Sequence, residues 1–246
     1  MHVTIRKWIE SHWGRFGKTK VVFFDVGGTL VFSDLSHLDL LHQALVIIGY
    51  KVAREEVLAA NDLARRAVAR RRRRHAARMD TGHASRMWLD HLAEALNLDL
   101  QGKDLEQELA GAIRRIEASG PEKVDPDAPP LLAHLLDRGL RLGIISNWSA
   151  DLPKYLEQRG LAMYFEAIIA SEAVGTAKPH REIFLKGLAA MGCSPRDAVH
   201  VGDDYWADVV GARDIGMRAI LIDRDGEDPH ADCPTIAHLR NVEDLV

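Results

Sequence analysis

The 246-residue sequence contains little cysteine and no long apolar run. Cys193 and Cys233 lie in unrelated segments, which excludes a disulfide framework and a CxxC metal pair. No apolar run approaches the roughly 20 residues that a membrane-spanning helix needs, so we expect no membrane partner. The scarcity of cysteine is typical of the reducing cytoplasm, and we predict a cytoplasmic location.

The sequence also lacks a strong excess of charge of either sign. Thirty-two Lys and Arg residues stand against thirty-six Asp and Glu residues, for a formal net charge of −4. Because no global field attracts a polyanion, we do not expect a nucleic-acid partner. The 47% hydrophobic and 28% charged content is that of an ordinary globular protein, and the length allows a core domain with an inserted smaller one.

The first nineteen residues combine apolar residues at helical spacing with interrupting charges. The apolar positions are Ile5, Trp8, Ile9, Trp13 and Phe16. Charged residues between them rule out the apolar core of a signal peptide. We interpret residues 1–19 as an amphipathic extension that packs on the body of the protein or on a partner, with a helix on a membrane surface as the alternative.

Residues 36–119 show helical periodicity and no convincing strand. Apolar positions fall on one stripe in three segments, which contain Leu38, Leu41, His42, Leu45 and Ile48; Trp88, Leu89, Leu92 and Leu96; and Leu105, Leu109, Ile113 and Ile116. We therefore predict an all-helical inserted domain over 36–119. Gly120, Pro121 and a proline-rich stretch at 125–130 mark the return to the parent domain.

A further helical segment, 55–78, carries an apolar stripe that becomes basic. The expected stripe contains Val57, Ala60, Leu63, Ala64, Ala67 and Val68 and continues at Arg71, Arg74 and His75. The five successive arginines at 70–74 circle the helix at about 100° per residue, so they cannot all point the same way. We interpret them as a solvated helix end, with a substrate-phosphate clamp or an RNA contact as the alternative.

Helices and strands alternate from about residue 130 onward. The pattern predicts helices at 130–138, 151–160, 180–191 and 206–215, with strands at 140–146, 166–170, 198–202 and 218–223. Such alternation builds a doubly wound, mostly parallel α/β sheet of Rossmann-like type, formed here by residues 20–35 and 120–246. Helix C-terminal caps are predicted at Gly139, Gly160, Gly192 and Gly216.

Two apolar strands of this sheet end in acidic turns. The run at 21–24 leads into Asp25 and a glycine turn. The run at 198–201 leads into Gly202, which is followed by Asp203, Asp204 and, four residues later, Asp208. Because open α/β sheets keep their functional groups at the carboxyl ends of the strands, these two ends predict a divalent-cation site.

These two segments, with Ser146-Asn147 and Lys178-Pro179 between them, resemble the four-part signature of the haloacid dehalogenase superfamily of aspartate-nucleophile hydrolases. The resemblance extends from Lys20 to about Asp223 and implies a helical cap inserted between the first and second motifs. The chain departs from the pattern at one position. Most phosphatases of the family carry Asp-x-Asp-x-Thr, whereas Asp25 here is followed two residues later by Gly27.

The resemblance implies a magnesium centre with a covalent nucleophile. Asp25 would be the nucleophile, and Asp25, the backbone carbonyl of Gly27 and Asp203 would bind Mg²⁺, which suits oxygen donors. Asp204 would support the site or add a ligand, and Asp208 would orient the motif lysine or a metal-bound water. The simpler alternative is a turn-capping aspartate with an acidic helix N-terminus.

The resemblance assigns substrate binding to four further residues, one of them through the turn that it orders. Ser146 and Asn147 would hold a phosphoryl oxygen, and the ammonium of Lys178 would offset the charge of the nucleophile and the transferred group. Thr29 would order the turn. The simpler alternatives are ordinary turn residues and a solvated surface lysine.

Gly27 removes the acid that would protonate the leaving oxygen and later activate water. Such proton transfer contributes about 10²–10⁴-fold, and alkyl phosphates, whose alkoxides leave poorly, would lose most. Aryl and acyl phosphates would lose less. His37 or His180 could replace the missing acid, whereas His200, within an apolar strand, is expected to be a core histidine.

The leading hypothesis is therefore hydrolysis of a small phosphorylated or otherwise anionic substrate. One alternative is metal-independent cleavage of a carbon–halogen bond, since the family's haloacid dehalogenases also lack the second aspartate. The other is a catalytically decayed binding or regulatory protein that uses residues 70–74 as its contact. The oligomeric state stays open, a homodimer included.

Overall fold

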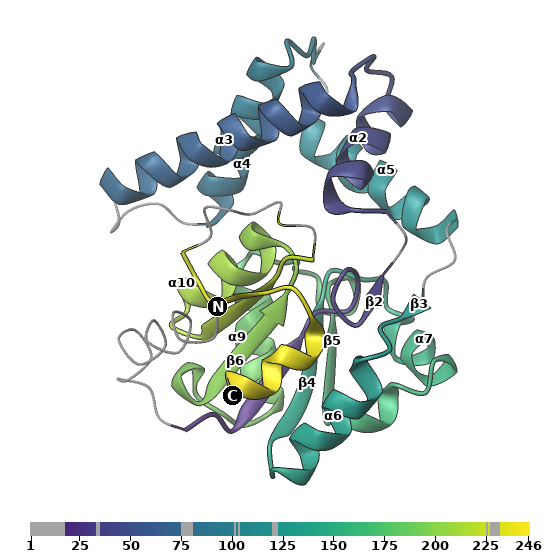
Figure 1. Cartoon of the computed structure of the whole chain (residues 1–246), viewed down its shortest axis with the longest axis vertical. Coiled ribbons are helices and arrows are strands. Elements are labelled where there is room, and N and C mark those ends of the chain that lie inside the picture. Colours follow the sequence, from purple (N-terminus) through teal and green to yellow (C-terminus); the bar gives the residue numbers. More distant parts are fainter. Residues whose placement is uncertain are drawn as a thin grey trace. The chain divides into compact units, whose positions relative to one another are not determined.

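The computed structural model describes residues 18–32, 35–74, 81–100, 102, 104–119, 123–224, 226 and 232–246. The chain forms two compact units (Figure 1). One unit ends at Phe32 and resumes at Val124, and the other spans 33–123. The amphipathic extension predicted for 1–19 falls, up to residue 17, outside the described residues.

The first unit is an α/β domain built on one parallel sheet. Its described strands have the order β5-β4-β1-β6-β7-β8. They are β1 (Val21–Phe24), β4 (Arg141–Ser146), β5 (Ala167–Ala170), β6 (Ala198–Gly202), β7 (Arg218–Ile222) and β8 (Thr235–Ile236). Phe24 of β1 pairs with Ile144 of β4 on one side and with Val201 of β6 on the other. The predicted fold class, a mostly parallel Rossmann-like sheet, is confirmed.

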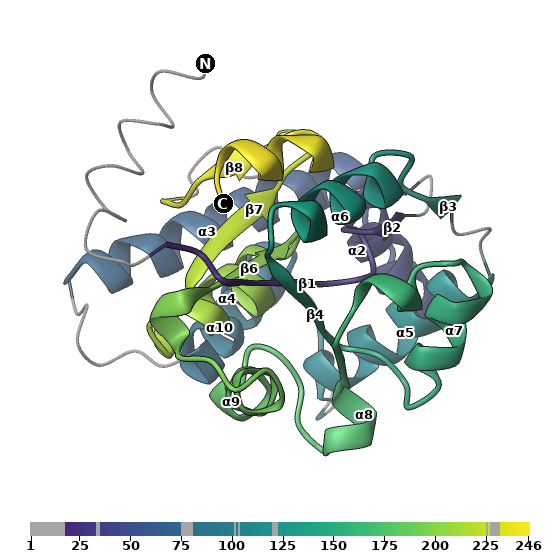
Figure 2. The same ribbon diagram turned by 90° about the horizontal axis from the view of Figure 1, so that it is seen from below.

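Strand β1 is buried on both faces, which explains its unbroken apolar sequence. Val22 and Phe24 join one hydrophobic core, and Val21 and Phe23 join the other, because side chains alternate across a strand. Helices α6 (Ala128–Asp137) and α7 (Leu152–Gln158) supply the first core. On the opposite face lie α9 (Arg181–Ala190) and α10 (Gly211–Asp214), as Figure 2 shows.

Shorter elements complete this unit. They are the helix α8 (Ser171–Val174) and the 3₁₀-helices at Ala162–Tyr164, Pro195–Asp197 and Leu239–Asp244. Two-residue strands β2 (Val31–Phe32) and β3 (Lys123–Val124) pair where the chain leaves and re-enters the unit. The pattern did not predict strands this short.

The four predicted glycine caps are confirmed. Each glycine follows a helix by two residues and has a positive φ that a residue with a Cβ rarely adopts. The φ values are +80° for Gly139, +69° for Gly160, +55° for Gly192 and +82° for Gly216.

The regular helix predicted at 206–215 is wrong in its first part. Residues Tyr205–Val210 form a π-helical turn, and only Gly211–Asp214 is α-helical. The carbonyl of Asp204 accepts from the amides of both Asp208 (2.9 Å) and Val209 (3.4 Å), which widens the turn. The Asp204 carboxylate stabilises this start by accepting from the amides of the next turn.

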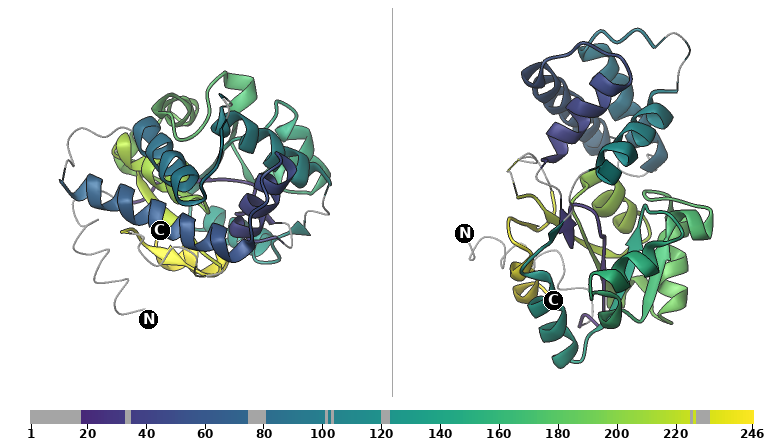
Figure 3. Two further views of the ribbon diagram at one scale, coloured as in Figure 1. Left: turned by 90° about the horizontal axis from the view of Figure 1, so that it is seen from above. Right: turned by 90° about the vertical axis from the view of Figure 1, so that its right-hand side faces the viewer.

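Apart from Lys123 in β3, the regular secondary structure in the described part of the second unit is helical. It contains α2 (His37–Ile47), α3 (Arg54–Arg74), α4 (Thr81–Ala95) and α5 (Leu105–Ser119). Helix α3 packs along α4, and α2 packs along α5 (Figure 3). Predicted stripe residues that form its core are Leu38, Leu41, Leu45, Leu89, Leu92, Leu105, Leu109 and Ile116.

The apolar stripe predicted for α3 is confirmed at four positions, half-buried at Ala67 and wrong at Leu63. Val57, Ala60, Ala64 and Val68 are buried, but the Leu63 residue is 59% exposed. Around the helix axis Leu63 lies about 60° from Ala60 and about 100° from Ala64, on the side of Ala60 away from Ala64 and therefore at the margin of the buried stripe. Arg71 is exposed, and the other arginine side chains at 70–74 lie outside the described residues. None of the described helices is both long and apolar enough to cross a bilayer.

Leu132 and Leu136 of α6 test the core of the α/β unit. Leu132 is fully buried, whereas Leu136 on the same helix is 39% exposed. We expect Leu132→Ala to lower the free energy of unfolding by about 2–5 kcal/mol, because the cavity adds to the lost burial. Leu136→Ala, the matched control, should cost less than about 1 kcal/mol. Urea unfolding measures both, and equal losses would contradict the assignment of this core.

Candidate active site

Three neighbouring strands deliver polar residues to one edge of the sheet. Asp25 follows β1, Ser146 ends β4, and Asp203 follows β6. The strands run parallel, so their carboxyl ends meet at this edge. The amide of Asp25 donates to the carbonyl of Val201 (2.9 Å), which extends the sheet pairing to the carboxylate itself.

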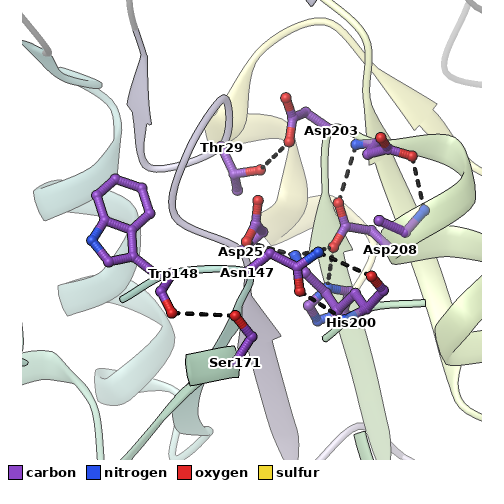
Figure 4. Close-up of polar contacts among 11 residues, drawn as sticks. Asp25, Thr29, Asn147, Trp148, Ser171, His200, Asp203 and Asp208 are labelled. Atoms are coloured by element: carbon purple, nitrogen blue, oxygen red, sulfur yellow. Dashed lines mark hydrogen bonds and ion pairs between the residues drawn. The ribbon is translucent and has the colours of Figure 1, made fainter. Parts of the chain in front are cut away.

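The glycine turn after Asp25 closes on one carbonyl group. The amides of Thr29, Leu30 and Val31 all donate to the Val26 carbonyl, at 2.9–3.2 Å. Gly28 has a φ of +67°, and a Cβ on it would lie 1.7 Å from Oδ2 of Asp203. Thr29 donates its hydroxyl to Oδ1 of Asp203 at 3.3 Å (Figure 4). Glycine is therefore required at position 28 for Asp203 to pack against the turn.

Lys178 lies buried between two carboxylates. Its Nζ is 2.6 Å from Oδ1 of Asp25 and 2.6 Å from Oδ1 of Asp208. Asn147 holds the lysine from the side, because its Oδ1 accepts from the Lys178 amide (2.7 Å) and its Nδ2 donates to the Lys178 carbonyl (2.9 Å). Both polar atoms of the Asn147 side chain thus position the lysine, and its predicted contact with a substrate stays a prediction.

The carboxylate of Asp208 accepts the largest number of hydrogen bonds in the cluster of Asp25, Lys178 and Asp208, and we call it the anchor carboxylate. Besides Lys178, it accepts a hydrogen bond from Nε2 of His200 (2.7 Å) on Oδ1 and from the Asp204 amide (3.1 Å) on Oδ2. A Cβ at Gly202 would lie 2.1 Å from its Cγ, so the approach depends on that glycine. Burial alone would raise the pKa of Asp208, but Lys178 and His200 hold it well below its usual range.

The other carboxylate of the pair behaves in the opposite way. Burial raises the pKa of Asp25 to about 7; Lys178 opposes this shift, and the charges of Asp208 and Asp203 add to it. Burial would lower the pKa of Lys178, but the two carboxylates raise it above its usual value, so the lysine stays charged. Asp25 is therefore the group of this cluster that exchanges a proton near neutral pH.

His200 is the core histidine that its apolar strand predicted. It is fully buried, and its ring meets Phe184 edge-to-face at 5.4 Å between centroids. Burial lowers its pKa more than the bond to Asp208 raises it, so the imidazole is neutral and donates from Nε2. Its position behind Asp208 orients the anchor carboxylate.

The carboxylates fit a divalent cation. Oxygens of Asp25, Asp203 and Asp208 lie within 4.8 Å of one another. Both oxygens of Asp208 accept hydrogen bonds, whereas the buried Oδ1 of Asp25 has an ion pair but no aligned hydrogen-bond donor in the described part of the chain. Mg²⁺ takes few protein ligands and prefers carboxylate oxygens, so Asp25 and Asp203 suit it best.

The remaining predicted residues lie as follows. The Asp204 carboxylate caps the π-helical turn through the amides of Trp206 (2.7 Å) and Ala207 (2.8 Å), which supports the placement of Asp208. Ser146 is buried at the end of β4. His180 is exposed at the start of α9, and the side chain of His37 lies outside the described residues.

Comparison with known proteins identifies the family. The model of the haloacid dehalogenase-like hydrolases matches residues 19–216, which is most of the chain. The chain belongs to this family of hydrolases. The resemblance inferred from the four motifs is thereby confirmed.

Similar proteins include phosphatases. "Haloacid dehalogenase-like hydrolase domain-containing protein 3" of Xenopus laevis is 36% identical over 144 residues, 57% of this chain and 59% of that protein. A phosphoserine phosphatase of Thermus thermophilus is 40% identical over 109 residues, 43% of this chain and 44% of that protein. The chain spans about half the length of the curated relatives it matches.

A solved structure of a HAD phosphatase from Thermococcus onnurineus is similar over nearly the whole chain. It is 25% identical, has a TM-score of 0.54, and the match covers 92% of this chain and 97% of that one. The hydrolase fold seen here is thus that of a solved member of the family.

Two side chains of the hydrolase that sequence reasoning missed flank the glycine turn. The ring of Trp148 lies 3.5 Å from where a Cβ of Gly27 would be, and it packs on Tyr155 with centroids 4.7 Å apart. Arg224 donates to the carbonyls of Gly28 and Thr29. Their positions were the available signal, since each follows a sheet strand at the edge that carries Asp25.

The raised pKa of Asp25 predicts pH-dependent cation binding. Mg²⁺ must displace the proton, so its apparent affinity should fall about tenfold per pH unit below about 7 and level off above it. Isothermal titration calorimetry between about pH 6 and 8 measures this slope and the released proton. Asp25→Asn is the control. It should bind Mg²⁺ weakly, with an affinity that does not change with pH. Affinity that does not change with pH in the natural protein would contradict the assignment.

Proposed function

We propose that this hydrolase is a Mg²⁺-dependent phosphatase that acts on a small phosphorylated metabolite through an aspartyl-phosphate on Asp25. The observation that carries the proposal is the convergence of Asp25, Lys178 and Asp203 at one sheet edge, with Asp208 behind the lysine. Similarity to a phosphoserine phosphatase supports phosphate esters as the substrate class.

In the first step an oxygen of Asp25 attacks phosphorus, and the bond between phosphorus and the ester oxygen breaks. The leaving oxygen takes the electron pair of that bond. In the second step water attacks the acyl-phosphate, which releases inorganic phosphate and restores the carboxylate. The Asp25 carboxyl must be ionised before it attacks phosphorus. Because its pKa is raised to about 7, it has to lose its proton before the first step.

The surroundings of Asp25 are suited to the charge of a phosphoryl group. The ammonium of Lys178 touches the nucleophile and would also face the transferred oxygens. Ser146, buried at the end of the adjacent strand, would donate its hydroxyl to one of them. Asp25, the Gly27 carbonyl and Asp203 would hold Mg²⁺, which supplies positive charge for the phosphoryl oxygens when bound.

Gly27 restricts the choice of leaving group. No carboxyl stands two residues after the nucleophile, and the ring of Trp148 lies beside that position instead. The leaving oxygen therefore departs without a proton from this position, which favours aryl or acyl phosphates over alkyl phosphates. The helical unit at 33–123 would act as the cap that selects the substrate. The cytoplasmic location and a homodimer stay predictions.

Replacement of the nucleophile is the primary test. We expect Asp25→Asn to lower the rate of phosphate release from an aryl phosphate with Mg²⁺ by at least about 10³-fold, because the covalent step is lost. Asp197→Asn is a matched control, since Asp197 is a surface carboxylate that pairs with Lys20 outside the site. It should retain full activity, measured as phosphate release.

Two results would contradict the proposal. One is the absence of Asp25-dependent phosphate release from every aryl and acyl phosphate tried. The other is halide release from 2-chloropropionate in the presence of a chelator, which would indicate metal-independent dehalogenation instead. Binding of nucleic acid without turnover would favour the decayed regulatory protein.

Restoring the family's aspartate tests the role of Gly27. We expect Gly27→Asp to raise turnover of an alkyl phosphate, such as phosphoserine, more than that of an aryl phosphate, with a difference of about tenfold or more. Gly27→Ala adds the Cβ against Trp148 without an acid, so it separates bulk from proton transfer. Equal changes for both ester classes would mean that another group already donates the proton.

A further inference from the structure

We propose that Arg224, with Asp125, is a positioning residue of this hydrolase. It holds the glycine turn at 26–31, called the catalytic turn below, in the conformation that the reaction needs. The inference rests on the proposed function for its kinetic readout only. The contacts on which it is built all lie within the α/β unit.

Arg224 connects parts of the chain that are far apart in sequence. It lies two residues after β7 and reaches past the end of β6 to the turn after β1. Its Nη1 donates to the carbonyl of Gly28, and its Nη2 donates to the carbonyl of Thr29 at 2.9 Å. These two carbonyls belong to residues that the chain holds against Asp203.

Asp125 fixes the guanidinium from the other side. Its Oδ2 accepts from Nη2 of Arg224 at 2.6 Å, and its Oδ1 accepts from the Asp127 amide at 2.9 Å. The Asp125 amide donates to the carbonyl of Leu30 at 2.9 Å. One ion pair thereby ties the turn to the point where the chain re-enters the α/β unit.

The charges favour positioning over direct action on a substrate. The Asp125 side chain is 8% exposed and the Arg224 side chain 25% exposed, so the pair is largely withdrawn from water. The carboxylate neutralises the guanidinium, and three donor contacts are already committed to protein oxygens. A planar fork is needed to bind two successive carbonyls and a carboxylate together, which a lysine cannot reproduce.

The expected consequence is geometric. Without the guanidinium, the carbonyls of Gly28 and Thr29 lose their donors, and the turn that carries Gly27 and contacts Asp203 is free to shift. A misplacement of about 1 Å at a reacting group lowers turnover by about 10²-fold. We therefore expect kcat to fall by about 10–10²-fold in Arg224→Gln with KM for an aryl phosphate changed less than about threefold.

A measurement independent of turnover accompanies the kinetics. The amides of Thr29, Leu30 and Val31 close the turn on Val26, so their hydrogen exchange reports its opening. Loss of a hydrogen bond to a charged group shifts such an equilibrium by about tenfold or more. Exchange at these three amides should accelerate by that factor in Arg224→Gln and Asp125→Asn, and exchange in β4 should stay unchanged.

Arg240 provides the matched control. It pairs with Asp127, two residues from Asp125, and among the described residues it makes no hydrogen bond to the turn at 26–31. Arg240→Gln should leave kcat and the exchange of the turn unchanged. Arg224→Lys keeps the charge without the fork and should recover less than half of the lost turnover. All variants are compared well below their unfolding temperatures, so that an unfolded fraction does not enter the rates.

Four outcomes would overturn the inference. A rise in KM with unchanged kcat in Arg224→Gln would make Arg224 a substrate contact. Full rescue by Arg224→Lys would make its charge decisive. Unchanged hydrogen exchange at residues 29–31 would show that Arg224 does not hold the turn. An effect of Arg240→Gln on kcat and exchange equal to that of Arg224→Gln would show the same. Since exchange needs no substrate, absence of phosphatase activity in the natural protein would defeat the proposed function and leave this test intact.

Discussion

The buried ammonium of Lys178 stands between the carboxylates of Asp25 and Asp208, and the site depends on this contact. One positive charge cannot neutralise two negative charges in a region of low polarity. Asp208, which also has His200 and a backbone amide as donors, keeps its charge at low pH, and the pKa of Asp25 rises to about 7. The environment thus separates two chemically identical groups into a permanent anion and an exchangeable one.

Close approach of carboxylates to the backbone makes this arrangement possible. Gly28 leaves room for Asp203, and Gly202 leaves room for Asp208, at distances that any Cβ would violate. Gly202 is the last residue of β6 and pairs with Leu221 of β7, and Gly28 lies in the turn that follows β1. The strands therefore fix the positions of the acidic residues, and glycine, which has no side chain, allows their carboxylates to converge.

Much of this structure follows from sequence patterns, since the buried strand before Asp25, the helical insert and the glycine caps have local signals. The acidic strand ends also identify Asp25, Asp203 and Asp208, because parallel strands bring their carboxyl ends together. Long-range contacts have no such signal. Arg224 meets Thr29 across 195 positions; its place after β7 indicates the edge of the sheet on which it lies, but no local pattern pairs it with Thr29.

Other differences have equally physical causes. The two-residue strands β2 and β3 are too short to show an alternating pattern. The π-helical turn depends on how the Asp204 carbonyl is shared between two amides, which periodicity does not encode. The exposure of Leu63 reflects a stripe narrower than its apolar composition suggested.

The order of the site residues along the chain has a consequence for biosynthesis. Asp25 is far from Lys178 and Asp208 along the chain, so the cluster closes only when distant segments meet. Non-local contacts of this kind form late in folding. A nascent polypeptide that has not yet extended past residue 208 contains the carboxylate of Asp25 without the complete set of charges that surrounds it in the folded protein.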